Sequence, residues 1–162
     1  MVDSFKFLPR LIATFYQMME LPPAGHIPWT PLPKPLADCT FGLVTSAGLY
    51  VDQPFDLDTE RSRPEWGDPT FRVIPAGATP AVSHLHYRPD DLLSDINIQL
   101  PIDRFQELAV TGRIGRLANH AYSFMGYQGY PPNTTAWQEI YGPQVAGRLK
   151  AEGVDCVLLT PS

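Results

Sequence analysis

Apolar residues recur at helical spacing in three segments of the chain. They follow the i, i+3, i+4, i+7 pattern of a helix with one buried face in residues 8–21, 101–112 and 137–153. The second and third segments each end at a glycine, which can adopt the left-handed conformation that closes many helices. The third is expected to be disturbed at Gly142 and Pro143, because proline removes a backbone donor. The pattern therefore predicts three helices.

Two other segments carry continuous apolar runs, which are typical of buried strands. They are residues 39–45 and 154–160. Shorter strands are expected at residues 70–74 and 97–100, and residues 83–87 are expected to form a loop or an edge strand.

The order of these segments predicts the fold class. A helix, a capping glycine and an apolar strand follow one another, which is the arrangement of a parallel α/β sheet. We expect a single α/β domain over residues 1–162, a three-layer sandwich around a mainly parallel sheet that is flavodoxin- or Rossmann-like. The 18 prolines gather largely in residues 22–35 and 54–89 and predict long surface loops. The acidic residues 52–69 are expected to be a solvated loop.

Ligands of such sheets bind at the carboxyl ends of the strands. Function is therefore expected near residues 45–48 and 160–162. Ser46 and Gly48 are expected to offer backbone contacts to a substrate, because small residues let a ligand approach closely.

The composition excludes several classes of protein. Apolar residues make up 44% and charged residues 18% of the chain, within the globular range. A net charge of −5 without a run of lysine or arginine argues against nucleic acid as a partner. No apolar stretch approaches the ~20 residues needed to cross a bilayer, and no secretory signal is visible, so a cytoplasmic protein without membrane contact is expected. Cys39 and Cys156 are expected to be buried thiols without a redox role.

His84 and His86 are the first candidates for chemistry. On an extended segment, side chains two apart face the same side, so both imidazoles would meet one ligand. Three interpretations stay open at this point: a metal site, substrate binding or proton transfer, and structural hydrogen bonding.

A second group of candidates lies in residues 112–126, a loop rich in glycine and polar side chains. His120 is expected to act beside the first two histidines, and Arg113 to pair with a substrate carboxylate. Tyr122 and Ser123 are expected to bind substrate, although Tyr122 fits a core position equally well.

The chain lacks the hydrolase elbow, the phosphate-binding glycine loop and the Cys-x-x-Cys pair. The residues alone thus indicate an α/β domain with a histidine-bearing pocket.

An ordered series of short blocks resembles a known family. Residues 153–161 (GVDCVLLTP) are similar to the strand that directly precedes a selenocysteine or cysteine in the selenoprotein B family of glycine, sarcosine, betaine and D-proline reductases, and further blocks resemble its short single-chain branch. These are residues 28–32 (PWTPL), 43–48 (LVTSAG), 71–75 (FRVIP), 83–87 (SHLHY), 95–97 (DIN), 101–104 (PIDR), 112–115 (GRIG) and 122–126 (YSFMG).

The resemblance implies that a reactive residue belongs after Ser162. We expect a selenocysteine or cysteine there, and we expect that the natural C-terminal part is missing. The hypothesis is that a UGA codon has been translated as a stop. A selenolate or thiolate between a strand and a helix N-terminus is stabilised by unpaired amide donors and the helix dipole. The 162-residue form is therefore expected to be inactive.

The function that the resemblance implies is that of a selenocysteine- or cysteine-dependent reductase component. It would act on a small amino-acid-like substrate with a thiol reductant, as a homo-oligomer or as a subunit of a reductase complex. No cofactor is expected in this chain. For the larger reductases, the resemblance implies reductive cleavage of a C–N bond with a pyruvoyl group on a partner subunit. Two alternatives stay open: a non-enzymatic small-molecule or metal-binding module that uses His84 and His86, and a structural subunit whose final strand completes a partner's sheet.

Overall fold

The computed structural model describes residues 8–18, 30–32 and 34–162. The chain divides into two compact units, residues 1–31 and 32–162. In the first unit, helix α1 (Arg10–Met18) forms where the apolar spacing predicts a helix. Its expected end near residue 21, and most of the prolines in residues 22–35, lie outside the described residues. The sheet and the other helices belong to the second unit.

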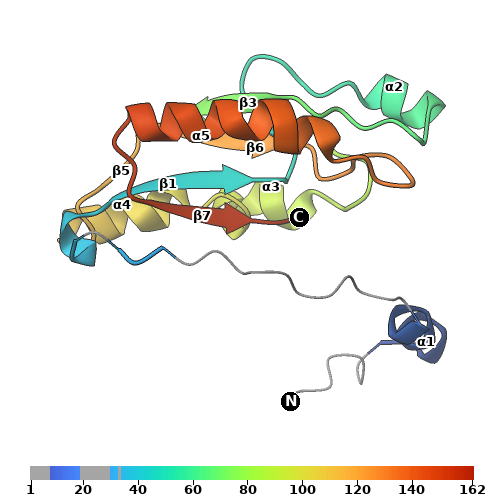
Figure 1. The fold of residues 1–162 in the computed structure, drawn as a ribbon, viewed down its shortest axis with the longest axis horizontal. Coiled ribbons are helices and arrows are strands. Elements are labelled where there is room, and N and C mark those ends of the chain that lie inside the picture. The colour runs from blue at the N-terminus through green and yellow to red at the C-terminus, as the bar shows by residue number, and fades with distance from the viewer. Residues whose placement is uncertain (1–7, 19–29, 33) are drawn as a thin grey trace. The chain divides into compact units, whose positions relative to one another are not determined.

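Strand β1 (Thr40–Thr45) lies inside a five-stranded sheet (Figure 1). It runs parallel to β7 (Cys156–Thr160) along one edge and to β5 (Arg116–Leu117) and β6 (His120–Phe124) along the other. Strand β3 (Phe71–Pro75) pairs antiparallel with β6. The mixed, mostly parallel sheet confirms the α/β prediction.

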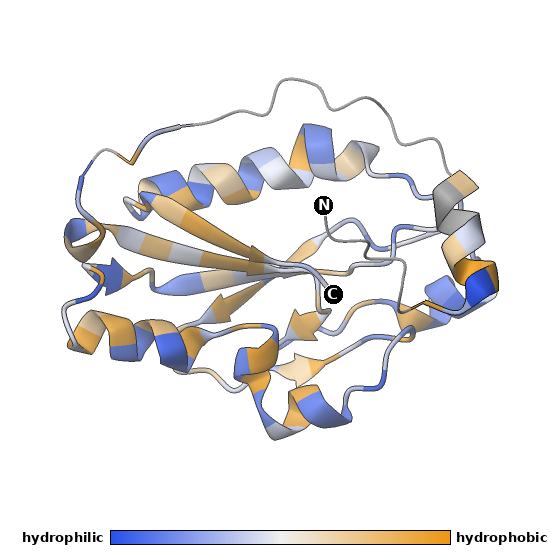
Figure 2. Cartoon of the chain, turned by 90° about the horizontal axis from the view of Figure 1, so that it is seen from below, coloured by the Kyte–Doolittle hydropathy of each residue, from blue (hydrophilic) through white to orange (hydrophobic). Residues whose placement is uncertain are grey.

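Helices lie on both faces of this sheet (Figure 2). One face is covered by α5 (Gly142–Ala151), which continues from the π-helical turn η4 (Trp137–Tyr141). The predicted disturbance at Gly142 and Pro143 is therefore confirmed as a change of helix type. The other face is covered by α3 (Asp90–Ser94), the short 3-10 helix η3 (Ile96–Ile98) and α4 (Ile102–Val110).

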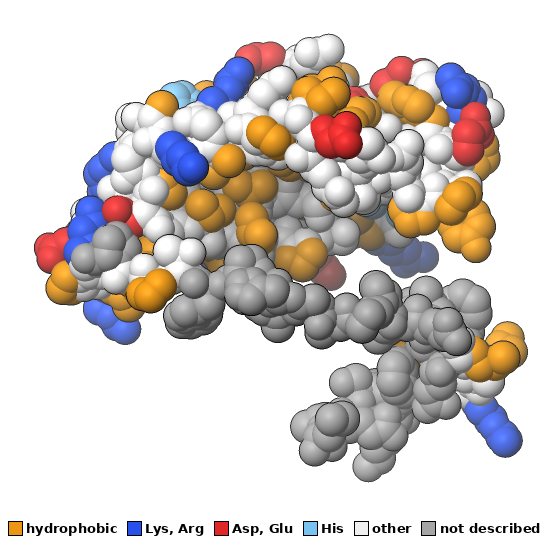
Figure 3. All heavy atoms as spheres, viewed as in Figure 1, with side chains coloured by type: hydrophobic (Ala, Val, Ile, Leu, Met, Phe, Trp, Pro, Cys, Tyr) orange, Lys and Arg blue, Asp and Glu red, His pale blue; other side chains and the backbone are white. Residues whose placement is uncertain are grey.

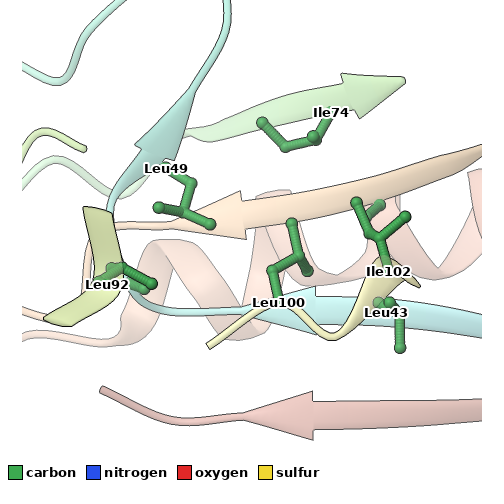
Figure 4. Close-up of a cluster of buried hydrophobic side chains, with 8 residues drawn as sticks. Leu43, Leu49, Ile74, Leu92, Leu100 and Ile102 are labelled. Carbon is green, nitrogen blue, oxygen red and sulfur yellow. The ribbon is translucent and has the colours of Figure 1, made fainter. Parts of the chain in front are cut away.

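The alternation of side chains along the strands divides the core into two parts. Leu43 of β1 and Ala121 of β6 face α4, and the residues after them, Val44 and Tyr122, face α5. Figure 4 shows the first cluster, in which eight apolar side chains meet between the sheet and α3 and α4; besides Ala47 and Ala121 they are Leu43, Leu49, Ile74, Leu92, Leu100 and Ile102. The predicted left-handed glycines that close the two helices are confirmed, with φ of 69° at Gly112 and 70° at Gly153.

Three predictions of secondary-structure type are wrong. Residues 97–100 form no strand, because the Asp95 carboxylate accepts the Asn97 backbone N–H (3.0 Å) and holds η3 in a tight turn. Residues 52–69 contain helix α2 (Leu57–Ser62), with Asp56 capping its first turn, rather than only a solvated loop. The expected loop of residues 112–126 contains β5 and β6.

Strand β7 is present as predicted, but it is not buried. Its only described neighbour is β1, so its outer edge is unpaired in the part of the chain that the structure describes. The exposed fractions are 43% for Val157, 36% for Leu158 and 68% for Leu159. Cys156 is half-buried for the same reason, whereas Cys39 is fully buried as expected.

Two smaller features complete the unit. The two-stranded pair β2 (Leu49–Tyr50) and β4 (Ala81–Val82) is antiparallel and connects the end of β1 to the segment that carries His84 and His86. Within the described ranges, no helix is long and apolar enough to cross a bilayer.

Candidate functional site

The β1 turn, residues 46–48, lies where the carboxyl ends of β1, β6 and β7 meet. The Ser46 N–H donates to the Thr160 carbonyl (3.2 Å), and the Gly48 N–H donates to the Phe124 carbonyl (2.9 Å). The Ser46 hydroxyl accepts the backbone N–H of Ser162 (2.9 Å). The turn after β1 is therefore tied to both neighbouring strands.

Gly48 brings the histidine loop, residues 83–87, against this turn. Its φ is 66°, and an added Cβ would lie 2.3 Å from the Ser83 carbonyl oxygen and 3.4 Å from the His84 ring. The Gly48 carbonyl also accepts the Ser83 N–H (2.8 Å). The small residue therefore allows another backbone segment to approach closely at this turn.

His84 is half-buried in this loop. Its Nδ1 accepts the backbone N–H of His86 (3.0 Å), and its ring lies 4.2 Å from the Tyr87 ring. Burial, followed by the nearby His86, lowers the pKa of His84 to about 4. At neutral pH the imidazole is therefore neutral, with its hydrogen on Nε2, which is buried and has no partner among the described residues.

His86 occupies a different environment. Its Nε2 lies 2.7 Å from Oε1 of Glu60, and its ring stacks on Tyr127 at 4.3 Å. The two histidine rings are nearly perpendicular, with centroids 5.8 Å apart, because residues 83–87 bend instead of running extended. The two imidazoles are close together, as expected, but they do not line up on one side of a strand.

Tyr87 connects the histidine loop to the end of β7. Its hydroxyl donates to the Ala47 carbonyl (2.7 Å). Burial raises the pKa of Tyr87, and a hydrogen bond with Ser162 opposes the rise. Ser162 therefore lies beside the β1 turn and the histidine loop at once.

Ser123 and Tyr122 are both buried in β6 but differ in position. The Ser123 hydroxyl accepts the Leu49 N–H (2.8 Å), which places Ser123 directly beneath the β1 turn. Tyr122 points to the α5 face and packs edge-on against Phe71 (5.8 Å). Its side chain belongs to the core, the second of the two positions that its sequence context allowed.

His120 and Arg113 lie away from the histidine loop. His120 begins β6, at the opposite end of the strand from the β1 turn, and its Nδ1 lies 2.7 Å from Oε1 of Glu152. It lines a shallow pocket of about 290 Å³ with Tyr122 and Arg148. Arg113 is exposed after α4, where its N–H donates to the Leu108 carbonyl (2.8 Å). The structure thus brings Ser46, Gly48, His84 and His86 together and leaves these two elsewhere.

Glu60 was missed by sequence reasoning. Its side chain is 2% exposed although it comes from an acidic segment, and burial raises the pKa of its carboxyl while His86 opposes the rise. The available signal was Asp56, a helix-capping residue followed by acidic residues of a first turn, which predicts a short helix here.

Among the described residues, no group of three or more His, Cys, Asp or Glu side chains is arranged to hold a metal ion.

An apolar groove of about 770 Å³ adjoins the site on the α5 face of the sheet. Its lining includes Ser46, Trp137, Val145, Leu159 and Pro161. Figure 3 shows hydrophobic side chains gathered between α5 and β7 on this side of the molecule. The groove begins where the β1 turn and the end of β7 meet.

Comparisons with known proteins agree on one family. The family model for glycine/sarcosine/betaine reductase selenoprotein B matches residues 10–162. The D-proline reductase subunit gamma of Acetoanaerobium sticklandii is 42% identical over 137 residues, which are 82% of this chain and 52% of the relative. The glycine reductase complex component B subunit gamma of Carboxydothermus hydrogenoformans is 28% identical over 148 residues, 90% of this chain and 33% of the relative. The betaine reductase complex component B subunit beta of Peptoclostridium acidaminophilum is 26% identical, with 90% and 33% covered.

The chain thus spans about half the length of the first of these relatives and a third of the other two. No solved structure matches it, so the flavodoxin- or Rossmann-like part of the fold prediction stays a prediction. Because the family model matches nearly the whole sequence, the chain belongs to the glycine/sarcosine/betaine reductase selenoprotein B family.

Proposed function

We propose that this chain is the part of a selenocysteine- or cysteine-dependent reductase that forms the site for a small amino-acid-like substrate. The observation that carries the proposal is the position of Ser162, whose backbone N–H donates to the Ser46 hydroxyl and which lies beside Tyr87. The Tyr87 ring in turn packs on His84. A selenocysteine or cysteine that followed Ser162 would enter beside a histidine pair at the carboxyl ends of parallel strands, where such sheets bind their ligands.

The proposed reaction is the reductive cleavage of a C–N bond. It takes up two electrons and two protons, so that the carbon and the nitrogen each gain a hydrogen when the bond breaks. A dithiol reductant supplies both and ends as a disulfide, with the selenolate or thiolate as the nucleophile between substrate and reductant. In this proposal His84 and His86 bind the substrate and move the protons.

A partner subunit is part of the proposal. The relatives from Carboxydothermus and Peptoclostridium are named as subunits of glycine and betaine reductase complexes, which supports assembly with other chains. A pyruvoyl group is proposed on such a partner. The polar groups that this chain offers near the end of β7 are the Ser46 hydroxyl, the half-buried Tyr87 and the two histidines.

The proposal is tested by sequencing the native gene past the codon for Ser162. We expect an in-frame UGA or cysteine codon followed by further coding sequence. The longer protein, with selenocysteine or cysteine at that position, is then assayed with dithiothreitol on D-proline, glycine, sarcosine and betaine. A UAA or UAG stop, or a longer protein that reduces none of the four with its partner subunits present, would overturn the proposal and favour a binding module.

A further inference from the structure

Glu60 is a buried carboxylate of helix α2. Helix α2 places it beneath the histidine loop, where Oε1 meets Nε2 of His86 at 2.7 Å. The other oxygen, Oε2, is also buried and has no hydrogen-bond partner among the described residues. A carboxylate that is 2% exposed is costly to bury, so its retention calls for a task that an apolar side chain would not perform.

The charges around Glu60 offer little compensation. Besides His86, the groups that act on it are the like charge of Asp68 and the opposite charge of Arg61. Asp68 is itself paired with Arg72 (3.2 Å), and Arg61 with the exposed Asp58 (3.5 Å). Among the residues that the structure describes, the one close partner of the Glu60 carboxylate is therefore the His86 ring.

The contact fixes which nitrogen of His86 carries hydrogen. An ionised carboxylate only accepts hydrogen bonds, so with Glu60 ionised Nε2 is the donor and Nδ1 is the nitrogen that is left for other work. Stacking on Tyr127 sets the plane of the ring. Nearly half of the His86 side chain is exposed, so a ligand has access to it.

We propose that Glu60 is a positioning residue that holds His86 in one tautomer and one orientation, and so makes His86 the proton-transfer group of the pair. No carboxylate of the described ranges contacts His84 in this way, and its Nδ1 already accepts the His86 N–H, so it acts as a neutral donor through Nε2. The assignment deepens the proposed function, on which it rests for the reaction that His86 serves. It also gives a role to a residue of α2, a helix that lies outside the sequence segments around β1 and β7.

The first test uses the 162-residue chain and needs no activity. Nitrogen-15 NMR of the histidine rings should show hydrogen on Nε2 of His86, and this proton should exchange with water at least about tenfold more slowly in the wild type than in Glu60→Leu. Asp58→Asn, on the same helix with a 96% exposed side chain, is the matched control and should leave the signal unchanged. If the wild-type ring carries its hydrogen on Nδ1, or exchanges as fast as an exposed imidazole, the assignment is wrong whether or not the variant folds.

The second test uses the longer reductase. Glu60→Gln should lower kcat by about a hundredfold and change KM little, because proton transfer typically contributes that much to a rate. In a His86→Ala background the same change should have no further effect on kcat, since Glu60 acts through His86. A purely structural Glu60 would give effects that multiply, and that outcome would overturn the proposal.

The two tests separate this inference from the proposed function. If the longer protein reduces no amino acid but the Nε2 proton is protected as expected, the reductase proposal fails and the role of Glu60 in holding His86 stands. If reductase activity is present and the Nε2 proton is not protected, the reductase proposal stands and the proposed role of Glu60 fails.

Discussion

Neighbouring residues of the same type occupy different environments in this protein. His84 and His86 are two positions apart, yet one lies against an aromatic ring and a backbone donor and the other against a buried carboxylate. Desolvation disfavours the charged form of an imidazole, so the half-buried His84 stays neutral. At the residue scale, burial and partners decide the chemistry of each histidine.

The depressed pKa of His84 predicts how stability depends on pH. An unfolded histidine takes up a proton near pH 6.5, whereas His84 in the folded state does so only near pH 4. Between these values the unfolded state binds more protons, so the contribution is complete above pH 6.5 and is lost as the pH falls toward 4. We expect about 1–2 kcal/mol after allowing for partial exposure.

Urea unfolding at pH 5 and pH 7 measures this contribution. In His84→Gln, the loss of stability between the two pH values should be smaller than in the wild type. His120→Gln is the control for removing an imidazole elsewhere. Equal pH dependence in wild type and His84→Gln would contradict the expectation.

Gly48 should tolerate substitution worse than another glycine with positive φ. Gly48→Ala combines left-handed strain with a contact of 2.3 Å to the Ser83 carbonyl, and we expect a loss of about 3 kcal/mol or more in the free energy of unfolding. Gly77→Ala is the matched control, because its φ is 85° but no atom lies within 4 Å, and it should lose only about 1–2 kcal/mol. Equal losses of unfolding free energy for the two variants in chemical denaturation would show that the close approach of residue 48 to Ser83 does not affect stability.

At the scale of elements, the long periodic segments and the short alternating strand at residues 70–74, which is β3, could be predicted, whereas two short elements without an apolar pattern could not. The helices at residues 101–112 and 137–153 and the strand β1 bury continuous apolar faces, which the spacing of residues shows directly. Helix α2 and the turn η3 are only six and three residues long and are held by Asp56 and Asp95 through local hydrogen bonds, which leave no apolar period.

The candidate site was predictable in part for a related reason. Strand ends point to the β1 turn, and the histidines stand out by their chemistry. Glu60 reaches His86 only through tertiary packing across 26 positions of sequence, and no local pattern encodes such a contact. Likewise, an apolar run predicts a strand such as β7 but does not distinguish an edge from a central position.

Helix α5 depends on a few buried contacts with the sheet. Leu149 is 6% exposed and lies against Gly42 of β1, so Leu149→Ala should lower the free energy of unfolding by about 2–5 kcal/mol. The neighbouring exposed Lys150→Ala should stay within about 0.5 kcal/mol of the wild type. Guanidinium unfolding followed by tryptophan fluorescence checks both, and similar losses would show that α5 is not held by this contact.

At the scale of the whole molecule, one side of the sheet is incompletely covered by the helices and loops of residues 34–162. The groove between α5 and β7 is lined almost entirely by apolar side chains, and Val157 and Leu159 contribute to it from an edge strand. Exposed apolar patches of this kind mark surfaces that bind other molecules or associate with themselves.

This surface predicts dye binding by the 162-residue chain. Leu159→Glu should reduce the fluorescence of 1-anilinonaphthalene-8-sulfonate severalfold and change the free energy of unfolding by no more than about 0.5 kcal/mol, because Leu159 is 68% exposed. Leu93→Glu is the control, since Leu93 is 63% exposed on α3, on the other side of the sheet. If the two variants reduce the fluorescence equally, the groove is not the dye site.

The pairing of β1 with β7 also constrains when the sheet can be completed during synthesis. Their hydrogen bonds join residues about 115 positions apart, as in the bond from the Thr45 hydroxyl to the Thr160 carbonyl. While a ribosome makes the intervening residues, the β7-facing edge of β1 has no partner, and contacts of such long range form slowly. The apolar run from Phe41 to Val44 is therefore available to chaperones in the nascent chain until β7 emerges.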